Sequence, residues 1–467
     1  MNIHAALANP RRYRARIQRL HERYLYTPQA LQQEGVSLAS VAFHQAKVSR
    51  LLARAIARGE YRVGSARART IVAEAKTRVV FSYALTDLVV HGVVADALAE
   101  AIEPDLSPGL YSYRKGHSWW RAVSRFAAYT RAHRRSRPDP RTRGLYVLRR
   151  DVEAYTDSIP VGPTSPLWPM LRRALDRSGA GAGLGPADWR LIESIVRAEV
   201  VAEDGARFTR YLGVPTGQPV SCVLFNFYLA AFDREFDAIP GGFYARYCDD
   251  ILFAHPDPEV VRDVDTRMRA ALARLALTMK DQKSRSLYLT GAGRASAVAP
   301  EFRGTTVVSF LGCFVTGAGT VALSRAKRRR LLADLDDRVA RTATVLRGAE
   351  RDTLGRAVCA VINRTLESRP SPSQQASALL LRKAVTDRPH LRQLDYMIAR
   401  IVLRAVVGES GVSAFRRLPY RVIRQDWRLI SLLHARNRWR VRSRGSLAGR
   451  RGQARPARLS AVGPDEA

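Results

Sequence analysis

The chain has 467 residues and a mass of 52.0 kDa, enough for about two to four domains with sizeable cores. Hydrophobic residues make up 46% of it and charged residues 25%, with 31 Gly and 23 Pro, which excludes a collagen-like or wholly disordered chain. The 77 Lys and Arg against 42 Asp and Glu give a formal charge of +35. A compact state with this charge repels itself, so we expect a polyanionic partner such as nucleic acid.

Residues 1–60 have apolar positions at helical spacing behind Arg-rich faces and predict a basic helical N-terminal extension. A long helical segment then ends where Glu103-Pro104 is followed by Ser107-Pro108-Gly109. The segment from Arg131 to Arg143 holds many arginines and two prolines, and it predicts a solvated connection.

From Gly144 the pattern changes to interleaved strands and helices, which indicates an α+β block. The apolar run from Leu145 to Leu148 predicts a buried strand that ends at Asp151. Further on, Phe243–Tyr247 and Ile251–Ala254 predict two strands joined by a hairpin tip at Cys248-Asp249-Asp250.

After about residue 320 the chain is predicted to be helical again through about residue 442. From Arg436 to Arg458 there are nine Arg and no acidic residue, which predicts a disordered, nucleic-acid-adhesive tail.

The four cysteines are far apart and have no metal-ligand spacing, which is typical of a reducing cytosol. The most apolar stretch, Val79 to Leu98, contains Asp87, His91 and Asp96 and is too polar to cross a bilayer. We therefore expect a cytoplasmic protein without a membrane partner.

Two acidic sites carry the chemistry that we expect. Asp151 ends one strand, and Asp249 and Asp250 follow another 98 residues later. Carboxylates from neighbouring strand ends repel one another unless a hard cation neutralises them, and Mg²⁺ binds carboxylates together with substrate phosphates. A two-metal phosphoryl-transfer site is one interpretation. A solvated Asp-Asp turn is the more common fate of this dipeptide when it stands alone.

Between these sites lies a loop from Gly213 to Ser221 that leads into an apolar helix predicted over Cys222–Phe236. Its glycines and prolines would let the backbone approach a nucleotide closely.

Six motifs in this order resemble those of bacterial reverse transcriptases, namely the group II intron, retron and abortive-infection enzymes. They cover about Tyr111 to Cys313. The resemblances are Tyr111–Ser118 to SYGFRPGRS, Asp151–Ile159 to DIxxFFxSI, Gly213–Ser221 to GLPQGxPxS, Tyr247–Asp250 to YxDD, Leu275–Ser284 to LGLTLNPEKS and Phe310–Cys313 to the FLG primer grip.

The resemblance implies roles for particular residues. It makes Asp151, Asp249 and Asp250 catalytic ligands of two Mg²⁺ ions, with Mn²⁺ as a substitute and the Val152 carbonyl as a backbone ligand. The residues implied to contact the nucleotide are Lys76, Arg78, Tyr155, Thr156, Thr216, Gly217, Gln218 and Lys283, and those of the primer grip are Phe310, Leu311 and Gly312. For Lys76 and Arg78 a solvated helix face is the alternative, and for the primer grip it is a buried strand.

The chain departs from the family pattern at two positions. Many reverse transcriptases have an aromatic residue that excludes the ribose 2′-hydroxyl five positions after the first aspartate, where this chain has Thr156 preceded by Tyr155. Thr216 replaces the glutamine of PQG, although Gln218 follows two positions on. Ordinary selection of deoxynucleotides is therefore not assumed. A group II nuclease module would require further cysteines near its end of the chain, but none follows Cys359. This favours a free-standing, defence-associated type.

The resemblance implies a right-hand polymerase of the α+β class. Its expected segments are the N-terminal extension over 1–60, fingers over 61–143, palm over 144–305, primer grip and thumb over 306–400, a helical region over 401–435 and the tail over 436–467. The palm sheet is expected to be antiparallel, with its helices on one face.

The implied function is RNA-templated DNA synthesis from dNTPs on a DNA or RNA primer, with a dedicated non-coding RNA as template and a role in antiphage defence. Template-independent or protein-primed nucleotide addition is the alternative that Thr156 and Thr216 keep open. A non-catalytic RNA-binding protein on a polymerase fold is a third, disfavoured because clustered carboxylates would repel RNA.

Overall fold

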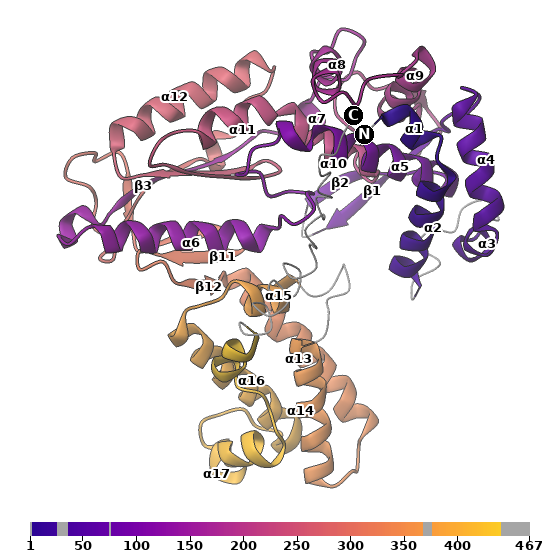
Figure 1. Cartoon of the computed structure of the whole chain (residues 1–467). Helices are drawn as coiled ribbons and strands as arrows, with labels where there is room; N and C mark the ends of the chain where they lie inside the picture. The colour runs from indigo at the N-terminus through magenta and orange to yellow at the C-terminus, as the bar shows by residue number, and fades with distance from the viewer. Residues whose placement is uncertain (1, 26–35, 74–75, 368–375, 440–467) are drawn as a thin grey trace, which may run out of the picture. The chain divides into compact units, whose positions relative to one another are not determined.

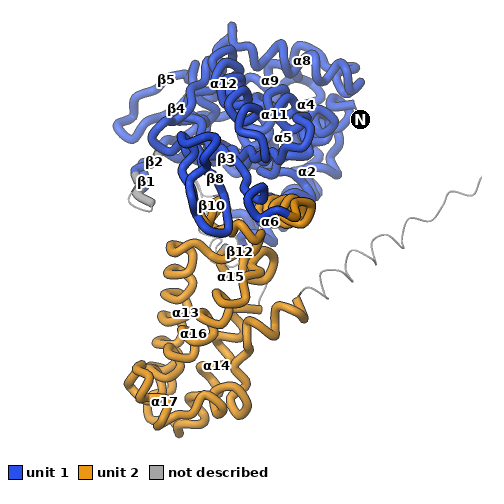
Figure 2. Tube along the Cα trace, turned by 90° about the vertical axis from the view of Figure 1, so that its left-hand side faces the viewer, with its two compact units in different colours: residues 1–122, 139–305 blue, residues 123–138, 306–467 orange. Residues whose placement is uncertain are grey.

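The computed structural model describes residues 2–25, 36–73, 76–367 and 376–439. The chain forms two compact units, which are described separately (Figure 2). Unit 1 comprises residues 1–122 and 139–305, and unit 2 comprises residues 123–138 and 306–467. The division after Thr305 coincides with the end of the expected palm segment, whereas residues 123–138 of the expected fingers cluster with unit 2.

Unit 1 begins with helices and a small sheet (Figure 1). Its first elements are α1 (Ile3–Leu7), α2 (Pro10–Tyr24), α3 (Leu38–Phe43), α4 (Gln45–Ala57), β1 (Ala66–Ala73), β2 (Lys76–Ser82), α5 (Leu85–Ile102) and the 3-10 helix η2 (Glu103–Asp105). Strands β1 and β2 form an antiparallel hairpin, and β1 also pairs with β4 (Val200–Val201), which pairs with β5 (Arg207–Phe208). The predicted basic helical extension over residues 1–60 is thus confirmed as helical where the structure describes it.

The larger sheet of unit 1 has five strands in the order β6-β7-β3-β8-β9. Their bounds are β3 (Leu145–Asp151), β6 (Phe243–Tyr247), β7 (Asp250–His255), β8 (Arg285–Leu289) and β9 (Arg303–Thr305). All neighbours are antiparallel except β8 and β9, which are parallel. The predicted buried strand before Asp151 and the predicted hairpin are both confirmed, and the expectation of an antiparallel sheet is wrong only at its β9 edge.

Helices complete unit 1. They are η3 (Pro140–Thr142), α7 (Tyr155–Ser158), α8 (Leu167–Arg177), α9 (Pro186–Val196), α10 (Pro219–Tyr228), α11 (Ala230–Asp237), α12 (Pro258–Arg274) and η4 (Asp281–Lys283). Helix α11 packs on β6, and α12 packs on β3 and β7 (Figure 1). Helix α12 starts sharply because Asp257 accepts a hydrogen bond from the Glu259 amide and Pro258 occupies the first turn.

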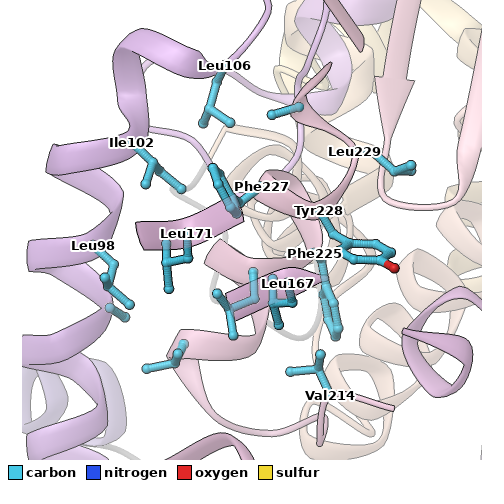
Figure 3. Packing of buried hydrophobic residues seen from close by; sticks show 14 of the residues in the cluster. Leu98, Ile102, Leu106, Leu167, Leu171, Val214, Phe225, Phe227, Tyr228 and Leu229 are labelled. Atoms are coloured by element: carbon cyan, nitrogen blue, oxygen red, sulfur yellow. The ribbon is translucent and has the colours of Figure 1, made fainter. Parts of the chain in front are cut away.

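Helix α5 runs through the core of unit 1 and buries most of its residues, while Asp96 and Glu100 lie on its more exposed side. It packs against α1, α2, α8 and α10. Figure 3 shows its Leu98 and Ile102 beside side chains of α8 and α10, including Leu171 and Phe227. The apolar stretch from Val79 to Leu98 is therefore divided between β2 and this helix. No helix among the described residues is long and apolar enough to span a membrane.

Unit 2 combines a three-stranded sheet with a helical bundle (Figure 2). The strands are β10 (Val307–Phe310), β11 (Cys313–Thr316) and β12 (Val321–Leu323), joined as an antiparallel meander. The helices are α13 (Arg325–Val345), α14 (Arg351–Glu367), α15 (Ala376–Lys383), α16 (Arg388–Val407), α17 (Ala414–Arg417) and the π-helical turn η5 (Val422–Asp426), followed by helical backbone over 432–439. Helices α13, α14 and α16 pack on one another.

The structure corrects three local predictions. Helix α6 (Trp119–Ser136) extends through half of the segment expected to be a solvated connection, where Arg131 donates to the carbonyl of Gly319. The helix expected over Cys222–Phe236 begins earlier, at Pro219, and breaks at Leu229 into α10 and α11. Residues 436–439 of the expected tail are helical, with Trp439 buried, and residues 440–467 lie outside the described residues.

His91 on α5 gives unit 1 a built-in acid sensitivity. Its ring is fully buried against Tyr83, with ring centroids 5.1 Å apart. Neither ring nitrogen has a hydrogen-bond partner among the described residues. Burial lowers the pKa of His91 from 6.5 to about 3, so the folded state keeps the ring neutral where the unfolded chain protonates it. Stability from this group is present above pH 6.5 and is lost as the pH falls from there toward 3.

We predict that His91→Leu makes unit 1 less sensitive to acid. Because the unfolded state binds the proton and the folded state does not, the wild type should lose about 2 kcal/mol between neutral pH and pH 5 through this group. Thermal unfolding of both proteins from pH 7.5 to pH 4.5 measures the difference. Replacing the exposed His44 by Leu is the control, and an equal pH dependence of wild type and His91→Leu would contradict the prediction.

Candidate active site

Three carboxylates meet at one end of the five-stranded sheet. Asp151 is the last residue of β3, and the strand register places it opposite Asp250, the first residue of β7. Asp249 lies in the two-residue connection between β6 and β7, and its carbonyl accepts a hydrogen bond from the Val152 amide at 3.1 Å. Pairing of β3 with β7 therefore brings Asp151 beside Asp249 and Asp250, although Asp151 and Asp249 are 98 residues apart in the sequence.

Burial and the neighbouring carboxylates raise the proton affinity of Asp249 and Asp250. The pKa of Asp249 is raised above its usual value, first by burial and then by repulsion from Asp151. The pKa of Asp250 is also raised, chiefly by burial, because the attraction of Arg149 only partly offsets burial and the two neighbouring carboxylates. Such a cluster is stabilised by added positive charge.

Two basic side chains supply part of that charge. Lys283 Nζ lies 2.7 Å from Asp151 Oδ2, and this hydrogen bond raises the pKa of the lysine. Arg149 Nη2 lies 3.5 Å from Asp250 Oδ1. The lysine is held in register because the Lys280 amide donates to the carbonyl of Asp151 at 2.8 Å, immediately before η4.

The donor set suits a hard divalent cation, since Mg²⁺ prefers carboxylate oxygens and keeps positions for water and phosphate. Within the part of the chain that the structure describes, however, no three acidic, thiol or imidazole side chains are already arranged as a closed ligand group. Lys283 pairs with Asp151 and Arg149 with Asp250, so two of the three carboxylates already have a positive neighbour. The residues that fit a divalent cation by chemistry are Asp151, Asp249 and Asp250.

The turn that presents Asp249 is strained and held from both sides. Cys248 has a left-handed backbone with φ of 55°, which costs a residue with a Cβ about 1 kcal/mol or more. Its amide donates to Ser112 Oγ at 3.1 Å, and its carbonyl accepts from Arg246 Nη1 at 2.9 Å. Ser112 is itself fixed by Asn226 of α10 through two hydrogen bonds. The motif over Tyr111–Ser118 thus supports the catalytic turn.

Arg246 is the buried cation on which this turn depends. Its side chain and that of Asp233 are both 0% exposed, and the guanidinium makes two 2.6 Å contacts with the carboxylate. Burial opposes the charge of Arg246, but pairing with Asp233 outweighs it and raises its pKa. Tyr244 donates a further 2.6 Å hydrogen bond to Asp233.

Two residues expected to contact the nucleotide, Thr216 and Gly217, lie near β2, and a third, Thr156, is joined to their loop. The Val214 amide donates to the carbonyl of Thr156 at 2.9 Å, which joins the loop over 213–221 to the segment after Asp151. Gly217 has φ of +101°, and a Cβ there would lie 2.5 Å from the carbonyl oxygen of Phe81 in β2, so only glycine fits. Thr216 Oγ1 also lies 3.4 Å from the carbonyl of Val79.

Other expected nucleotide contacts are placed differently. Tyr155 is 3% exposed and its hydroxyl donates to the carbonyl of Phe225, so its ring belongs to the core. Gln218 is 2% exposed and caps α10 by accepting from the Val220 amide. The backbone of Lys76 and Arg78 runs in strand β2, which corrects the helix-face alternative. Their side chains lie outside the described residues.

The expected primer grip forms a tight hairpin in unit 2. Phe310 pairs with Cys313, and the two residues between them, Leu311 and Gly312, have φ of 47° and 77°. Two consecutive left-handed residues are the geometry of a type I′ hairpin turn. The Phe310 side chain is fully buried, as the buried-strand alternative expected, and the Leu311-Gly312 turn is partly exposed.

Sequence reasoning missed the residues that support the site. Arg246, Asp233, Asn226 and Ser112 were not predicted, and neither was Arg149 beside Asp250. A signal was present for Arg246, because it is a lone charge within the apolar and aromatic run over residues 243–248, and a charge is buried only when it is paired.

Residues 175–315 match the protein-family model described as "Reverse transcriptase (RNA-dependent DNA polymerase)". Over this segment the chain is similar to reverse transcriptases. The match includes Asp249, Asp250, Lys283 and the Phe310–Cys313 hairpin, and it begins after Asp151. The family is that of an RNA-directed DNA polymerase, as the motifs predicted.

Three solved structures are similar to this chain at low identity. Apo telomerase from Candida tropicalis matches with a TM-score of 0.44 and 11% identity over 79% of this chain and 62% of that chain. The same telomerase truncated from its C-terminal domain matches with a TM-score of 0.42 and 12% identity over 56% of this chain and 55% of that chain. Telomerase from Candida albicans in complex with a TWJ fragment of telomeric RNA matches with a TM-score of 0.41 and 12% identity over 81% of this chain and 62% of that chain. The chain spans just over half to about three fifths of their lengths. No curated protein matches the sequence.

We predict that Asp233→Asn destabilises unit 1 by about 3–5 kcal/mol, because it leaves the Arg246 charge buried without its partner. The double variant Asp233→Leu with Arg246→Met should lose less than Asp233→Asn alone, since no uncompensated charge stays buried. Chemical denaturation of the three proteins measures this order. A double variant less stable than the single variant would contradict it.

Proposed function

We propose that this protein is an RNA-directed DNA polymerase whose catalytic residues are Asp151, Asp249 and Asp250. The observation that carries the proposal is the register of β3 and β7, which places Asp151 opposite Asp250 with Asp249 in the adjoining turn. The family match, which ends within unit 2, supports the same reaction class.

In this proposal each side chain has a defined task. The three aspartates, with the Val152 carbonyl, bind two Mg²⁺ ions or Mn²⁺ in their place, which when bound activate a primer 3′-hydroxyl and neutralise the leaving pyrophosphate. Lys283, whose pKa is raised further by its bond to Asp151, carries a positive charge at neutral pH and binds the pyrophosphate oxygens. Arg149 orients Asp250.

The nucleotide would lie between the catalytic edge and strand β2. The hydroxyls of Thr156 and Thr216 and the backbone at Gly217 line this region, and Lys76 and Arg78 of β2 would hold the triphosphate. Because Tyr155 is in the core and Gln218 caps α10, neither is retained as a nucleotide contact. The polymerase parts would be fingers around β1 and β2, palm around β3 and β7, and primer grip and thumb in unit 2.

A second candidate activity is nucleotide addition without a template. Thr156 and Thr216 keep this activity open, because both depart from the family pattern at positions that contact the nucleotide there. Comparing dNTPs with rNTPs, and primed RNA template with no template, separates the two activities. Products that copy the supplied RNA support the first, and products unrelated to it support the second.

We predict that Asp249→Asn lowers metal-dependent nucleotide incorporation by about 1,000-fold, because charge stabilisation by a bound cation supplies several kcal/mol of the barrier reduction. The variant should fold and bind RNA like the wild type. Incorporation of labelled nucleotides in Mg²⁺ measures the loss. The exposed Asp263→Asn on α12 is the matched control, and retained polymerisation by Asp249→Asn would refute the site assignment.

We further propose, from the motif order alone, that the enzyme acts in antiphage defence on a dedicated non-coding RNA. Expression in a bacterial host should reduce phage plaque counts, and Asp249→Asn should abolish the reduction. Sequencing the RNA that copurifies with the wild type would identify the template. Equal protection by wild type and Asp249→Asn would contradict a role for DNA synthesis in defence.

A further inference from the structure

Unit 2 contains an open cavity of about 880 Å³ between α16, α17, the π-helical turn η5 and the helix over 432–439. Its lining combines three aromatic rings with four arginines and a single aspartate. Neither the catalytic carboxylates nor the expected primer grip belong to this lining. The motif analysis assigned it no role.

The aromatic rings form a partly exposed stack. The rings of Tyr396 and Phe415 lie 6.0 Å apart at an interplanar angle of 25°, and Tyr420 meets Phe415 edge-on at 6.1 Å. Tyr396 is 39% exposed and Tyr420 40% exposed, so neither ring is buried in the core. The guanidinium of Arg400 lies 5.8 Å from the centre of the Tyr396 ring, and that of Arg424 lies 5.3 Å from the centre of the Tyr420 ring. Helix α16 and the segment around η5 hold them as a fixed platform.

The charges around the platform leave a positive excess. Asp395 is buried and satisfied, because Arg424 pairs with it at 3.2 Å and Ser431 and the Leu432 amide donate to it. Arg424 also donates to the Tyr420 hydroxyl at 2.8 Å, so its guanidinium is fully engaged in holding the wall.

The side chains of three exposed lining arginines, Arg392, Arg428 and Arg438, have no hydrogen-bond or ion-pair partner among the described residues. Arg428 has a left-handed backbone with φ of 57°. Asn363 fixes this strained residue by donating to its carbonyl and accepting from the Ile430 amide, each at 2.9 Å. Strain held in this way at a cavity wall is typical of a functional position.

Stacked, exposed aromatic rings beside unpaired arginines match the chemistry of unpaired nucleotides. Bases stack on aromatic faces whatever their sequence, and the flanking guanidinium groups bind backbone phosphates. A base-paired duplex hides its base faces and could use only the arginines. The chain's own residues 440–467 carry seven Arg and two acidic residues, so like charge disfavours them as the occupant.

We propose that this cavity binds single-stranded nucleic acid, with a base on the Tyr396 ring and phosphates on Arg392, Arg428 and Arg438. The site lies in unit 2 and goes beyond the proposed polymerase reaction, since it would hold a strand through bases that are not paired. Its occupancy does not require catalysis.

The test uses the full-length protein and an unpaired oligoribonucleotide of about ten nucleotides, a length within the range of such sites. The comparison probes are an oligonucleotide of equal length without bases and a base-paired duplex. Wild type should bind the base-containing strand most tightly. Tyr396→Leu should weaken that binding about tenfold and leave the abasic strand unchanged, whereas Tyr396→Phe should bind like the wild type.

The arginines are tested by salt dependence. R392A/R428A/R438A should reduce the slope of log K against log salt by about 2, since each single-strand phosphate contact contributes about 0.7. The control R347A/R356A/R364A removes the same charge from exposed positions of unit 2 outside the cavity lining and should change the slope less. Thermal unfolding shows whether each variant is folded.

Photocrosslinking of an oligoribonucleotide that contains 4-thiouridine places the strand directly. Crosslinks in α16 or in residues 414–438 support the proposal. Crosslinks confined to other segments, equal affinity for duplex and single strand, or an unchanged Tyr396→Leu would overturn it. Binding is measured without nucleotides, so the proposal and the polymerase assignment can fail independently.

Discussion

The buried pair of Arg246 and Asp233 is the contact on which the catalytic edge depends. One guanidinium joins α11 through Asp233, α10 through the Asn226 carbonyl and the catalytic turn through the Cys248 carbonyl. The backbone of Arg246 also pairs with the segment from Gly109 to Tyr111. Because a buried charge is tolerated only when all its hydrogen bonds are made, every one of these elements must be in place at once. The pair therefore couples the position of Asp249 to the packing of the whole sheet and its helices.

The active-site edge combines opposite electrostatic requirements. The chain as a whole is strongly basic, which draws a polyanion to it at long range. The catalytic edge instead gathers three carboxylates, and burial together with mutual repulsion raises the pKa of Asp249 and Asp250. Lys283 offsets part of that repulsion by pairing with Asp151, and Arg149 does so by pairing with Asp250. The arrangement suits a reaction in which negative phosphates and positive cations arrive together, since each neutralises what the other would repel.

The two units present nucleic acid with different surfaces. Unit 1 offers backbone loops and carboxylates, where the loop at Gly217 approaches β2 too closely for any side chain. Unit 2 offers a hairpin turn at Leu311-Gly312 and the arginine-flanked aromatic platform around Tyr396. In the proposed function the first set would act on a phosphate bond, and in the further proposal the second would hold a strand. Binding by bases and phosphates in unit 2 would add affinity without placing further basic groups beside the catalytic carboxylates.

The sequence by itself determined the α+β class, strand β3 ending at Asp151 and the hairpin at Asp249-Asp250, because hydrophobic patterning and turn chemistry act over a few neighbouring residues. Motif order predicted the three carboxylates and Lys283 as one site. Tertiary structure alone decided that Tyr155 and Gln218 serve the core and a helix cap, that α10 and α11 separate at Leu229, and that Arg246 supports the catalytic turn. The partner of Tyr155 is Phe225, 70 residues away, and that of Arg246 is Asp233, 13 residues away on another element. A local pattern carries no record of which such group will satisfy a buried hydroxyl or charge.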